Sequence, residues 1–534
     1  MGTSTRPVAL AQRGMVSSPH YLSSGAGLRV LQDGGSAVDA AVAMNAALGV
    51  VYPHMTGVGG DALWLIHDAS TGKVHALNGS GRAGSEATRE WFSEQGHQQI
   101  PIRGPLAAIT VPGAVDSWCT AHQWFGRLPL SSVLSPAIDY ARDGYPVCQA
   151  QADCFSEVLD VLSSYPSSQE ALLPGQRAPR FGEVIRFPRL AETLETIARE
   201  GRDGFYSGAV AAEMVSSLRR AGGLLNHDDF AAQRSQWQEP LSTNYRGFDC
   251  YQHPPNSQGL AHLIMLNILE GFDISGMGAD SSDYVHTIVE ATKRAFSERD
   301  RYVTDPDHSD VPIEQLLSKD YAAELRASID LETTYQAPAT AAVGGDTTCS
   351  VAVDGDGNAV SVIQSLYHEC GSGFVAGDTG VLLQNRGAFF SLDPEHVNRL
   401  EPAKRTFHTL MPGMLLRDGR PSLVYGTMGG EGQPQTSTAL VTRIVDHDHD
   451  VQQAIDLPRW LYGRTWGEQT QDLRIERRFT DDTRTDLRKR GHPVRTVADT
   501  DDIMGHAQAI AIDHTSDVLS GGADPRGEGV ALGW

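Results

Sequence analysis

Positively charged residues are scarce in this sequence relative to negatively charged ones. The chain has 43 lysines and arginines against 66 aspartates and glutamates, and its formal net charge is −23. This shortage excludes a nucleic-acid partner, because binding to a phosphate backbone needs a basic face. It still permits a small anionic substrate, since a few cationic side chains can form a local pocket in an acidic protein.

Long hydrophobic segments are missing as well. The sequence has no run of about 18 apolar residues, so we expect no membrane-spanning helix and no membrane partner. Residues 1–13 contain no apolar segment of the ~7–15 residues that a secretory signal needs. These two absences predict a cytoplasmic protein.

Cysteine is sparse, with six residues in 534 and no CxxC spacing. We therefore expect reduced, mostly buried thiols rather than a disulfide framework or a thiolate metal site. The acidic and histidine-rich run 446–450 could hold a metal ion or form a solvated turn between two helices. We expect the turn, because no other ligand cluster accompanies the run. The sequence thus predicts no metal and no cofactor.

The order of the predicted elements indicates the fold class. An Ala-rich helix over 37–50 is followed by a glycine loop at 53–61 and by strands over 62–67 and 74–77. The pattern from 130 to about 330 is mostly helical, whereas the chain after Thr347 is rich in strands, including 380–383 and a sheet edge at 521–526. Strands and helices that segregate in runs favour helices stacked on two sheets over a βαβ winding.

The junction at 344–354 is the candidate chemical centre. Two glycines are followed by Asp346, Thr347 and an alternating β-branched segment that predicts a strand. The region 333–343 before it is rich in Ala, Thr and Pro and is typical of a linker. By itself the junction is an ordinary entry from a loop into a strand.

Motifs spread over nearly the whole chain change that interpretation. They occur in a fixed order: Val58-Gly59-Gly60, Asp346-Thr347-Thr348, the turn 354–360, Gly371-Ser372-Gly373, residues 381–385, Gly429-Gly430 and Asp524-Pro525-Arg526. Together they resemble the γ-glutamyltranspeptidase family of N-terminal-nucleophile (Ntn) hydrolases. The resemblance implies an α/β (α+β) fold, namely an αββα four-layer sandwich of two stacked antiparallel sheets covered by helices.

The resemblance also implies a self-processing enzyme. The precursor would cut itself between Asp346 and Thr347 into a large subunit, 1–346, and a small subunit, 347–534, which together form one domain; a dimer of such heterodimers is possible. Thr347 would then carry a free α-amino group with a pKa near ~7.7–8.0 and act as nucleophile with its own base.

The family also implies roles for residues around Thr347. The amides of Gly429 and Gly430 would form the oxyanion hole, and Ser365 would be the second hydroxyl that orients the nucleophile. Asn385 and Thr348 are candidates for support.

The expected substrate pocket departs from the γ-glutamyl pattern. Ser80 takes the position of the family's carboxylate-binding arginine, with Arg82 two residues later, and Phe389 replaces the aspartate that binds the α-ammonium group. Tyr367 replaces an asparagine, and His408-Thr409 replace paired serines. A pocket without its anion does not favour a buried ammonium group. Arg386 remains as a guanidinium that can hold a carboxylate by two hydrogen bonds, so we expect a small carboxylate-bearing amide.

Further motifs are similar to the oxamate amidohydrolase branch of the family, which converts oxamate to oxalate and ammonia in purine breakdown. They are residues 367–373, 385–394, 428–436 and 463–467. The segment 391–404 is short, which implies a reduced lid and favours water over an amino-acid acceptor. Oxamate is therefore the leading candidate substrate.

The sequence leaves several alternatives open. The same scaffold could serve a γ-glutamyl hydrolase or transferase, a cephalosporin-type acylase, or an uncleaved binding protein without catalysis. Arg386 and Arg82 compete for the substrate carboxylate, and Arg386 could instead be a structural ion-pair partner. His408 could be a structural loop histidine, and Tyr367 could be a core aromatic residue rather than a pocket wall.

Overall fold

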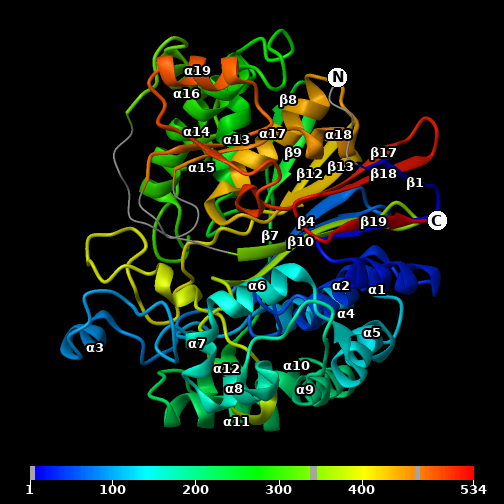
Figure 1. Ribbon diagram of the computed structural model, residues 1–534, viewed down its shortest axis with the longest axis vertical. Coiled ribbons are helices and arrows are strands. Elements are labelled where there is room, and N and C mark those ends of the chain that lie inside the picture. The colour runs from blue at the N-terminus through cyan, green and yellow to red at the C-terminus, as the bar shows by residue number, and fades with distance from the viewer. Residues whose placement is uncertain (1–5, 337–345, 464–469) are drawn as a thin grey trace.

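Two seven-stranded sheets stack face to face at the centre of the molecule (Figure 1). This computed structural model describes residues 6–336, 346–463 and 470–534. The strands of the first sheet follow the order β1 (Ala9–Ala11), β18 (Val518–Ala523), β17 (Ala507–Asp513), β13 (Arg420–Thr427), β12 (Gly413–Arg417), β9 (Phe248–Gln252) and β8 (Leu241–Tyr245). Those of the second follow the order β19 (Val530–Gly533), β2 (Met15–Ser18), β10 (Asp346–Val353), β11 (Ala359–Tyr367), β3 (Asp61–Asp68), β4 (Lys73–Gly79) and β7 (Gln236–Gln238).

The central strands β3 and β11 are buried on both faces, and the period of two explains how. On β3, Leu63 and Leu65 belong to the core between the sheets, while Trp64 and Ile66 belong to the core under the helices. All neighbouring strands within the two sheets are antiparallel. Successive side chains of a strand point to opposite faces, so one sequence of apolar residues supplies two separate cores.

Helices cover the outer face of each sheet. Figure 1 shows α1 (Tyr21–Gln32), α2 (Ala37–Val51), α4 (Ala114–Phe125) and α5 (Leu130–Asp143) below the second sheet. Above the first sheet lie α13 (Gly259–Leu269), α14 (Ser282–Tyr302), α17 (Gln433–Val445) and α18 (Val451–Asp456). This arrangement confirms the predicted αββα sandwich.

The remaining elements lie outside this sandwich. The helices are α3 (Arg89–Glu94), α6 (Gln149–Glu157), α7 (Leu159–Ser163), α8 (Pro166–Leu172), α9 (Pro188–Glu200), α10 (Arg202–Tyr206), α11 (Ala209–Arg220), α12 (His227–Ala232), α15 (Ile313–Leu316), α16 (Lys319–Ala327) and α19 (Asp481–Lys489). A small sheet contains β14 (Trp460–Tyr462), β15 (Leu473–Glu476) and β16 (Val494–Val497), and β5 (Tyr145–Pro146) pairs with β6 (Val184–Ile185).

Two predictions about single segments were wrong, and a third was incomplete. The region 130–330 is mostly helical, as predicted, but it also contributes β7, β8 and β9 to the two large sheets. Residues 380–383 form isolated bridges rather than a strand, and Gly380 has a φ of +70° that interrupts extended backbone. Residues 521–526 do not form an edge of the first sheet, since β1 pairs with the outer side of β18.

Each sheet contains strands from both sides of Thr347. In the second sheet β10 lies between β2 and β11, and β19 pairs with the other side of β2. The ranges 6–336 and 346–534 therefore share both sheets. Among the described helices, none has the length and hydrophobicity that crossing a bilayer requires.

Candidate active site

Thr347 lies near the start of β10, opposite a bulge in β11. Asp346 pairs with Tyr367 of β11, and Thr348 pairs with Gln364, so Ser365 and Leu366 of β11 both face Thr347. Such a bulge bends its own strand, here β11, and redirects the side chain of the extra residue. Thr347 is 1% exposed, and the hydroxyl of Thr348 donates a 3.0 Å hydrogen bond to the carbonyl of Gln364. Gly344 and Gly345, and residues 464–467 of the later motif, lie outside the described residues.

The end of β11 opposite Thr347 has an unusual backbone. Tyr367 has a φ of +89°, which is rare for a residue other than glycine. Its amide donates a 2.7 Å hydrogen bond to the hydroxyl oxygen of Ser365, which is fully buried. Positive φ values of this kind persist only where the surroundings fix them, and they cluster at functional sites.

Arg386 lies beside Ser365, at the start of a short 3₁₀ helix (Arg386–Phe389). Its guanidinium is buried and donates hydrogen bonds to the hydroxyls of Thr409 (3.2 Å) and Ser365 (3.5 Å). The guanidinium carbon lies 4.3 Å from the ring centre of Tyr367 and 5.4 Å from that of Phe389. The two rings therefore contribute cation–π attraction to the charge.

Arg386 has no ion pair within the described part of the chain. Among the described residues no carboxylate lies within ion-pair distance of its guanidinium, and its Nε has no hydrogen-bond partner. Burial lowers the pKa of Arg386 to about 10, although Tyr367 and Asp61 counteract part of this effect. A buried cation without a partner anion is costly for a fold, so the site is suited to receive an anion.

Asp61 and His408 form a second buried pair next to this arginine. Asp61 is opposite Ser365 in the β3–β11 register, and its Oδ2 lies 3.2 Å from Nε2 of His408. Its Oδ1 accepts hydrogen bonds from the amides of Gly81 and Gly113 and from the side chain of Gln384. Burial and the charge of Arg386 lower the pKa of His408 to about 4, so this ring is neutral at pH 7. His408 thus faces Asp61 rather than offering a second positive charge.

A glycine turn at Gly429–Gly432 follows β13. Gly429 has a φ of +124° and Gly430 a φ of +51°, and both values favour glycine over residues with a side chain. Within the described part of the chain neither of these two amides donates a hydrogen bond. Two adjacent amides that are not used within the fold are suited to bind a developing negative charge.

Gln258 connects the glycine turn with the arginine. Its side-chain amide donates hydrogen bonds to the carbonyls of Thr409 (2.7 Å) and Gly430 (2.9 Å). Since Thr409 also accepts from Arg386, and Arg386 contacts Ser365, one chain of contacts runs from the glycine turn to the bulge opposite Thr347. The fold thereby brings together residues that the sequence alone placed in a common pocket.

Two other predicted pocket residues have different partners. Arg82 is part-exposed and pairs with Asp305 (3.3 Å) and Asp307 (2.8 Å). Asn385 accepts a hydrogen bond from the amide of His368 and donates one to the carbonyl of Ile102. Both side chains are therefore committed to contacts within the protein, and neither contacts the Arg386 guanidinium.

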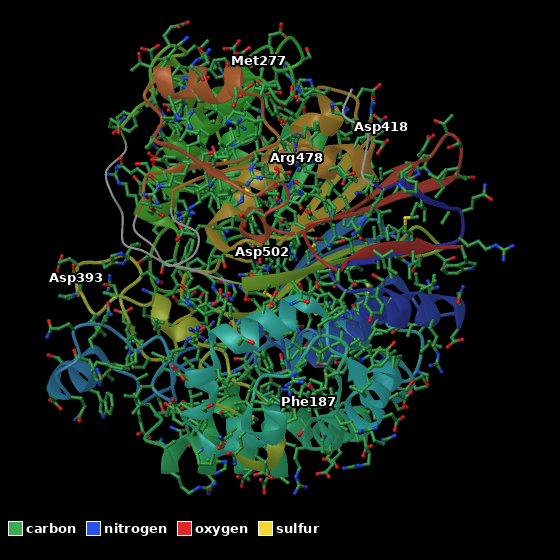
Figure 2. All side chains as sticks on the ribbon, viewed as in Figure 1. Phe187, Met277, Asp393, Asp418, Arg478 and Asp502 are labelled. Atoms are coloured by element: carbon green, nitrogen blue, oxygen red, sulfur yellow. The ribbon has the colours of Figure 1, made fainter. Side chains whose placement is uncertain are left out.

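The short segment 391–404 folds back on itself. The amide of Ser391 bonds to the carbonyl of Asn398, and the amide of Leu400 bonds to the carbonyl of Ser391. Asn398 also donates a 2.9 Å hydrogen bond to the carbonyl of Phe389. Asp393 of this segment lies at the periphery of the molecule, at the left of Figure 2. The segment is thus tied to the outer side of the arginine-bearing loop.

Sequence reasoning missed the residues that support the glycine turn. Gln258 is 172 positions from Gly430 in the chain. Arg299 of α14 donates hydrogen bonds to Gln258 (3.1 Å) and to Glu431 (2.6 Å), and all three side chains are buried. No local pattern marks such partners, because they come from three separate segments.

One group of three possible metal ligands occurs among the described residues: His286, Glu290 and His492. Lys293 and Arg294 both pair with Glu290, and the two imidazoles bond to each other at 2.8 Å. Two cations beside the only carboxylate oppose a metal ion by repulsion. In the run 446–450, Asp446 pairs with Arg246 and Asp450 caps α18.

Known proteins resemble this chain over its length. The sequence model described as "Gamma-glutamyltranspeptidase" matches residues 23–534. The "Glutathione hydrolase-like YwrD proenzyme" of Bacillus subtilis (strain 168) is 51% identical over 521 residues, which cover 97% of this chain and 98% of that protein. The "Oxamate amidohydrolase proenzyme" of Klebsiella pneumoniae is 44% identical over 532 residues, or 98% and 99% of the two chains.

Solved structures agree with the sequence relatives. The "Crystal structure of cephalosporin acylase from Bacillus halodurans" matches with a TM-score of 0.93 at 39% identity and covers 100% of this chain and 98% of that one. A family match over most of the sequence is thus accompanied by the same fold. The chain belongs to the γ-glutamyltranspeptidase family, and it is an amidohydrolase of the Ntn type.

Proposed function

We propose that this protein is a self-processing amidohydrolase that cleaves a small carboxylate-bearing amide through a threonyl acyl-enzyme. The leading candidate reaction is the hydrolysis of oxamate to oxalate and ammonia. The observation that carries this proposal is the buried guanidinium of Arg386, which has no carboxylate partner among the described residues and donates to Ser365 opposite Thr347.

Maturation would begin at the bond between Asp346 and Thr347. The Thr347 hydroxyl attacks the carbonyl carbon of Asp346, the peptide nitrogen leaves, and an ester forms. Water then hydrolyses the ester, which frees the Asp346 carboxylate and the α-amino group of Thr347. The products are a large subunit, 1–346, and a small subunit, 347–534. Support comes from the β11 bulge opposite this position and from the proenzyme names of the two relatives.

Amide hydrolysis would follow at the new chain end. The free amine of Thr347, with an expected pKa of ~7.7–8.0, takes the proton of its own hydroxyl. The oxygen attacks the amide carbon, and the amides of Gly429 and Gly430 bind the oxyanion; losing one such donor typically lowers the rate about 10²–10³-fold. The proton passes to the leaving nitrogen, which departs as ammonia, and water releases the acid from the ester.

Arg386 would select the acyl group. A guanidinium binds a carboxylate by two parallel hydrogen bonds, and no described carboxylate forms an ion pair with Arg386. Phe389 and Tyr367 form an apolar wall at this point, with ring centres 4.5 Å apart. An acyl group with an α-ammonium would meet a cation and two aromatic rings rather than an anion. The pocket therefore favours oxamate over γ-glutamyl compounds. We propose no substrate contact for Arg82 or Asn385, while His408, Thr409 and Tyr367 would shape the pocket around Arg386.

A γ-glutamyl hydrolase is the second candidate. The glutathione hydrolase-like relative has higher identity than the oxamate amidohydrolase, 51% against 44%. Release of glutamate from glutathione at a rate above that of ammonia from oxamate would favour this candidate and would contradict the pocket argument.

Two measurements test the proposal. Denaturing gels of wild type should show two bands, with Thr347 at the N-terminus of the smaller one, and the Thr347→Ala variant should remain one chain. Ammonia release should then be screened over oxamate, glutamine, glutathione and glutaryl amides, with Thr347→Ala as the blank. Uncleaved wild type, or a processed enzyme inactive on oxamate, would contradict the respective part.

We also propose a cytoplasmic location. All six cysteines lie in described segments, and no disulfide joins any of them. Five of them are buried, which agrees with a reducing compartment. Fractionation of cells that produce the protein, with activity or antibody detection, tests this proposal.

A further inference from the structure

Gln258 occupies an unusual position between two parts of the proposed site. It precedes α13 as the N-cap residue, yet its side chain makes no capping hydrogen bond. The hydroxyl of Ser257 accepts from the first helical amide instead, at 3.1 Å. The Gln258 side chain is fully buried and is used entirely outside its own helix.

Every polar atom of the Gln258 side chain has a hydrogen-bond partner. The two hydrogens of Nε2 are donated to the carbonyls of Thr409 and Gly430, and Oε1 accepts from Arg299 at 3.1 Å. The backbone amide of Gln258 donates to the carbonyl of His408 at 2.9 Å. An amide group whose two donors are both used is fixed in plane and direction. Gln258 therefore holds the chain at 408–409 and the glycine turn in one relative orientation.

The carbonyl of Gly430 matters because of its neighbours in the turn. Fixing this carbonyl restricts the ψ angle of Gly430, and glycine has no side chain that would restrict it otherwise. Glu431, the next residue, is held by Arg299, which also holds Gln258. The two amides proposed to bind the oxyanion thus depend on a support that starts at Gln258.

We propose that Gln258 is a positioning residue that couples the anion subsite, formed by Arg386 and Thr409, to the orientation of the glycine turn. This inference rests on the proposed function, because it assigns the oxyanion role to the turn. An anion bound to Arg386 would fix the guanidinium, which donates to the hydroxyl of Thr409. Gln258 donates to the carbonyls of Thr409 and Gly430, so it links the position of Thr409 to that of Gly430. The coupling makes oxyanion stabilisation depend on a correctly seated acyl carboxylate.

The test compares two buried glutamines. Gln452 is also buried, donates to the carbonyl of Ala523 (3.0 Å) and to Asp456 (2.8 Å), and accepts from the amide of Ala523 (3.0 Å). It lies in α18, outside the proposed site. Gln258→Met and Gln452→Met therefore each remove three buried hydrogen bonds, one of them to a charged side chain, with the same change of shape at different places in the fold.

The steady-state kinetics of oxamate hydrolysis distinguish the two. In Gln258→Met we expect kcat to fall about 10–100-fold, since small misplacements of reacting groups cost up to about 10²-fold, while KM changes less than about threefold. In Gln452→Met we expect kcat within about twofold of wild type, with a comparable loss in thermal unfolding temperature. Equal kcat values for the two variants would overturn the inference.

A second variant covers failure of the first to fold or process. Gln258→Glu keeps the shape and the acceptor for Arg299 but lacks both donors, and the same fall in kcat is expected. Wild-type kcat in Gln258→Glu would also overturn the coupling. Wild type that is inactive on oxamate would contradict the proposed function itself, and the inference about Gln258 would then fail as well.

Discussion

Two buried arginines of this protein have opposite surroundings. Arg526 binds Glu476 through two hydrogen bonds (2.6 and 2.9 Å) and Asp524 through a third (3.0 Å). Arg386 has hydroxyl and aromatic neighbours. Burial lowers the pKa of both, but the two carboxylates more than offset it at Arg526, whose pKa is raised, whereas that of Arg386 is lowered to about 10.

This difference separates structural from functional use of the same residue type. The Arg526 cluster is complete, so its charge contributes to holding α18, β15 and β18 together. The Arg386 guanidinium has no ion-pair partner among the described residues, and its burial is a cost that substrate binding can offset. Asp524-Pro525-Arg526, one of the motifs that identified the family, thus belongs to the complete cluster rather than to the pocket.

The largest expected effect comes from breaking the complete cluster. Arg526→Met removes three hydrogen bonds to two buried carboxylates, Glu476 and Asp524, which keep Arg478 and Arg459 as their cationic partners. We expect the free energy of unfolding to fall by about 3–5 kcal/mol. Chemical denaturation in the Thr347→Ala background measures this on a single chain. Arg29→Met is the control, because the exposed Arg29–Asp33 pair should contribute about 0–1 kcal/mol. Equal losses in both variants would contradict the comparison.

Removing the charge of Arg386 should lower activity without lowering stability. In Arg386→Met we expect kcat/KM for oxamate to fall about 10²–10³-fold, because the substrate carboxylate would be buried without its partner. The unfolding temperature should stay equal or rise, since an uncompensated buried charge is lost. Arg386→Lys keeps the charge without the two-pronged geometry and should lie between. A destabilised Arg386→Met with normal kinetics would assign Arg386 a structural role.

A carboxylate introduced beside Arg386 should give this arginine a partner of the kind that Arg526 has. Phe389→Asp places a carboxylate on the 3₁₀ helix that carries Arg386, and we expect it to compete with the substrate. KM for oxamate should rise about 10–100-fold, with competition relieved at low pH, where aspartate is protonated. Phe389→Asn is the isosteric control without charge. Equal KM values for the two variants would show that Arg386 does not bind the substrate carboxylate.

The smallest effect concerns the neutral histidine beside Arg386. The pKa of His408 is about 4 in the folded protein and near 6.5 when unfolded, so the unfolded chain binds the extra proton between these values. Stability from this residue is therefore present above pH 6.5 and is lost as the pH falls towards 4. In His408→Gln the free energy of unfolding should decline less steeply in this window, by about 1.4 kcal/mol per pH unit. Unfolding curves at pH 4.5 to 7 measure the slope, and an unchanged slope would contradict a neutral buried His408.

The sequence allowed prediction of features that depend on local patterns. The strand after Thr347, the helix over 37–50 and the four-layer class were all correct, because periodicity and a family pattern determine them. Strands β8 and β9 were missed since they lie within a long helical region, and β9 joins β8 to the sheet by pairing with β12, which comes more than 160 residues later. Their stability comes from that distant partner rather than from their own propensity.

The residues of the site also divide into those that local patterns predict and those that depend on distant partners. The proximity of Arg386 to Ser365 was expected in outline, whereas the choice between Arg386 and Arg82 depended on where Asp305 and Asp307 fold. Gln258 could not be identified, because its role exists only through contacts with Thr409 and Gly430. Partners that a residue acquires through tertiary structure leave no trace in its own neighbourhood.

Because each sheet contains strands from both sides of Thr347, a cut at this residue changes how the protein refolds. Before a cut at Thr347, β2 and β10 belong to one molecule and find each other by an intramolecular search. After it, the same pairing is a reaction between two molecules, so refolding becomes second order and slows on dilution. The uncut Thr347→Ala chain would regain its fold at any concentration, whereas the processed enzyme would keep its structure mainly through slow unfolding.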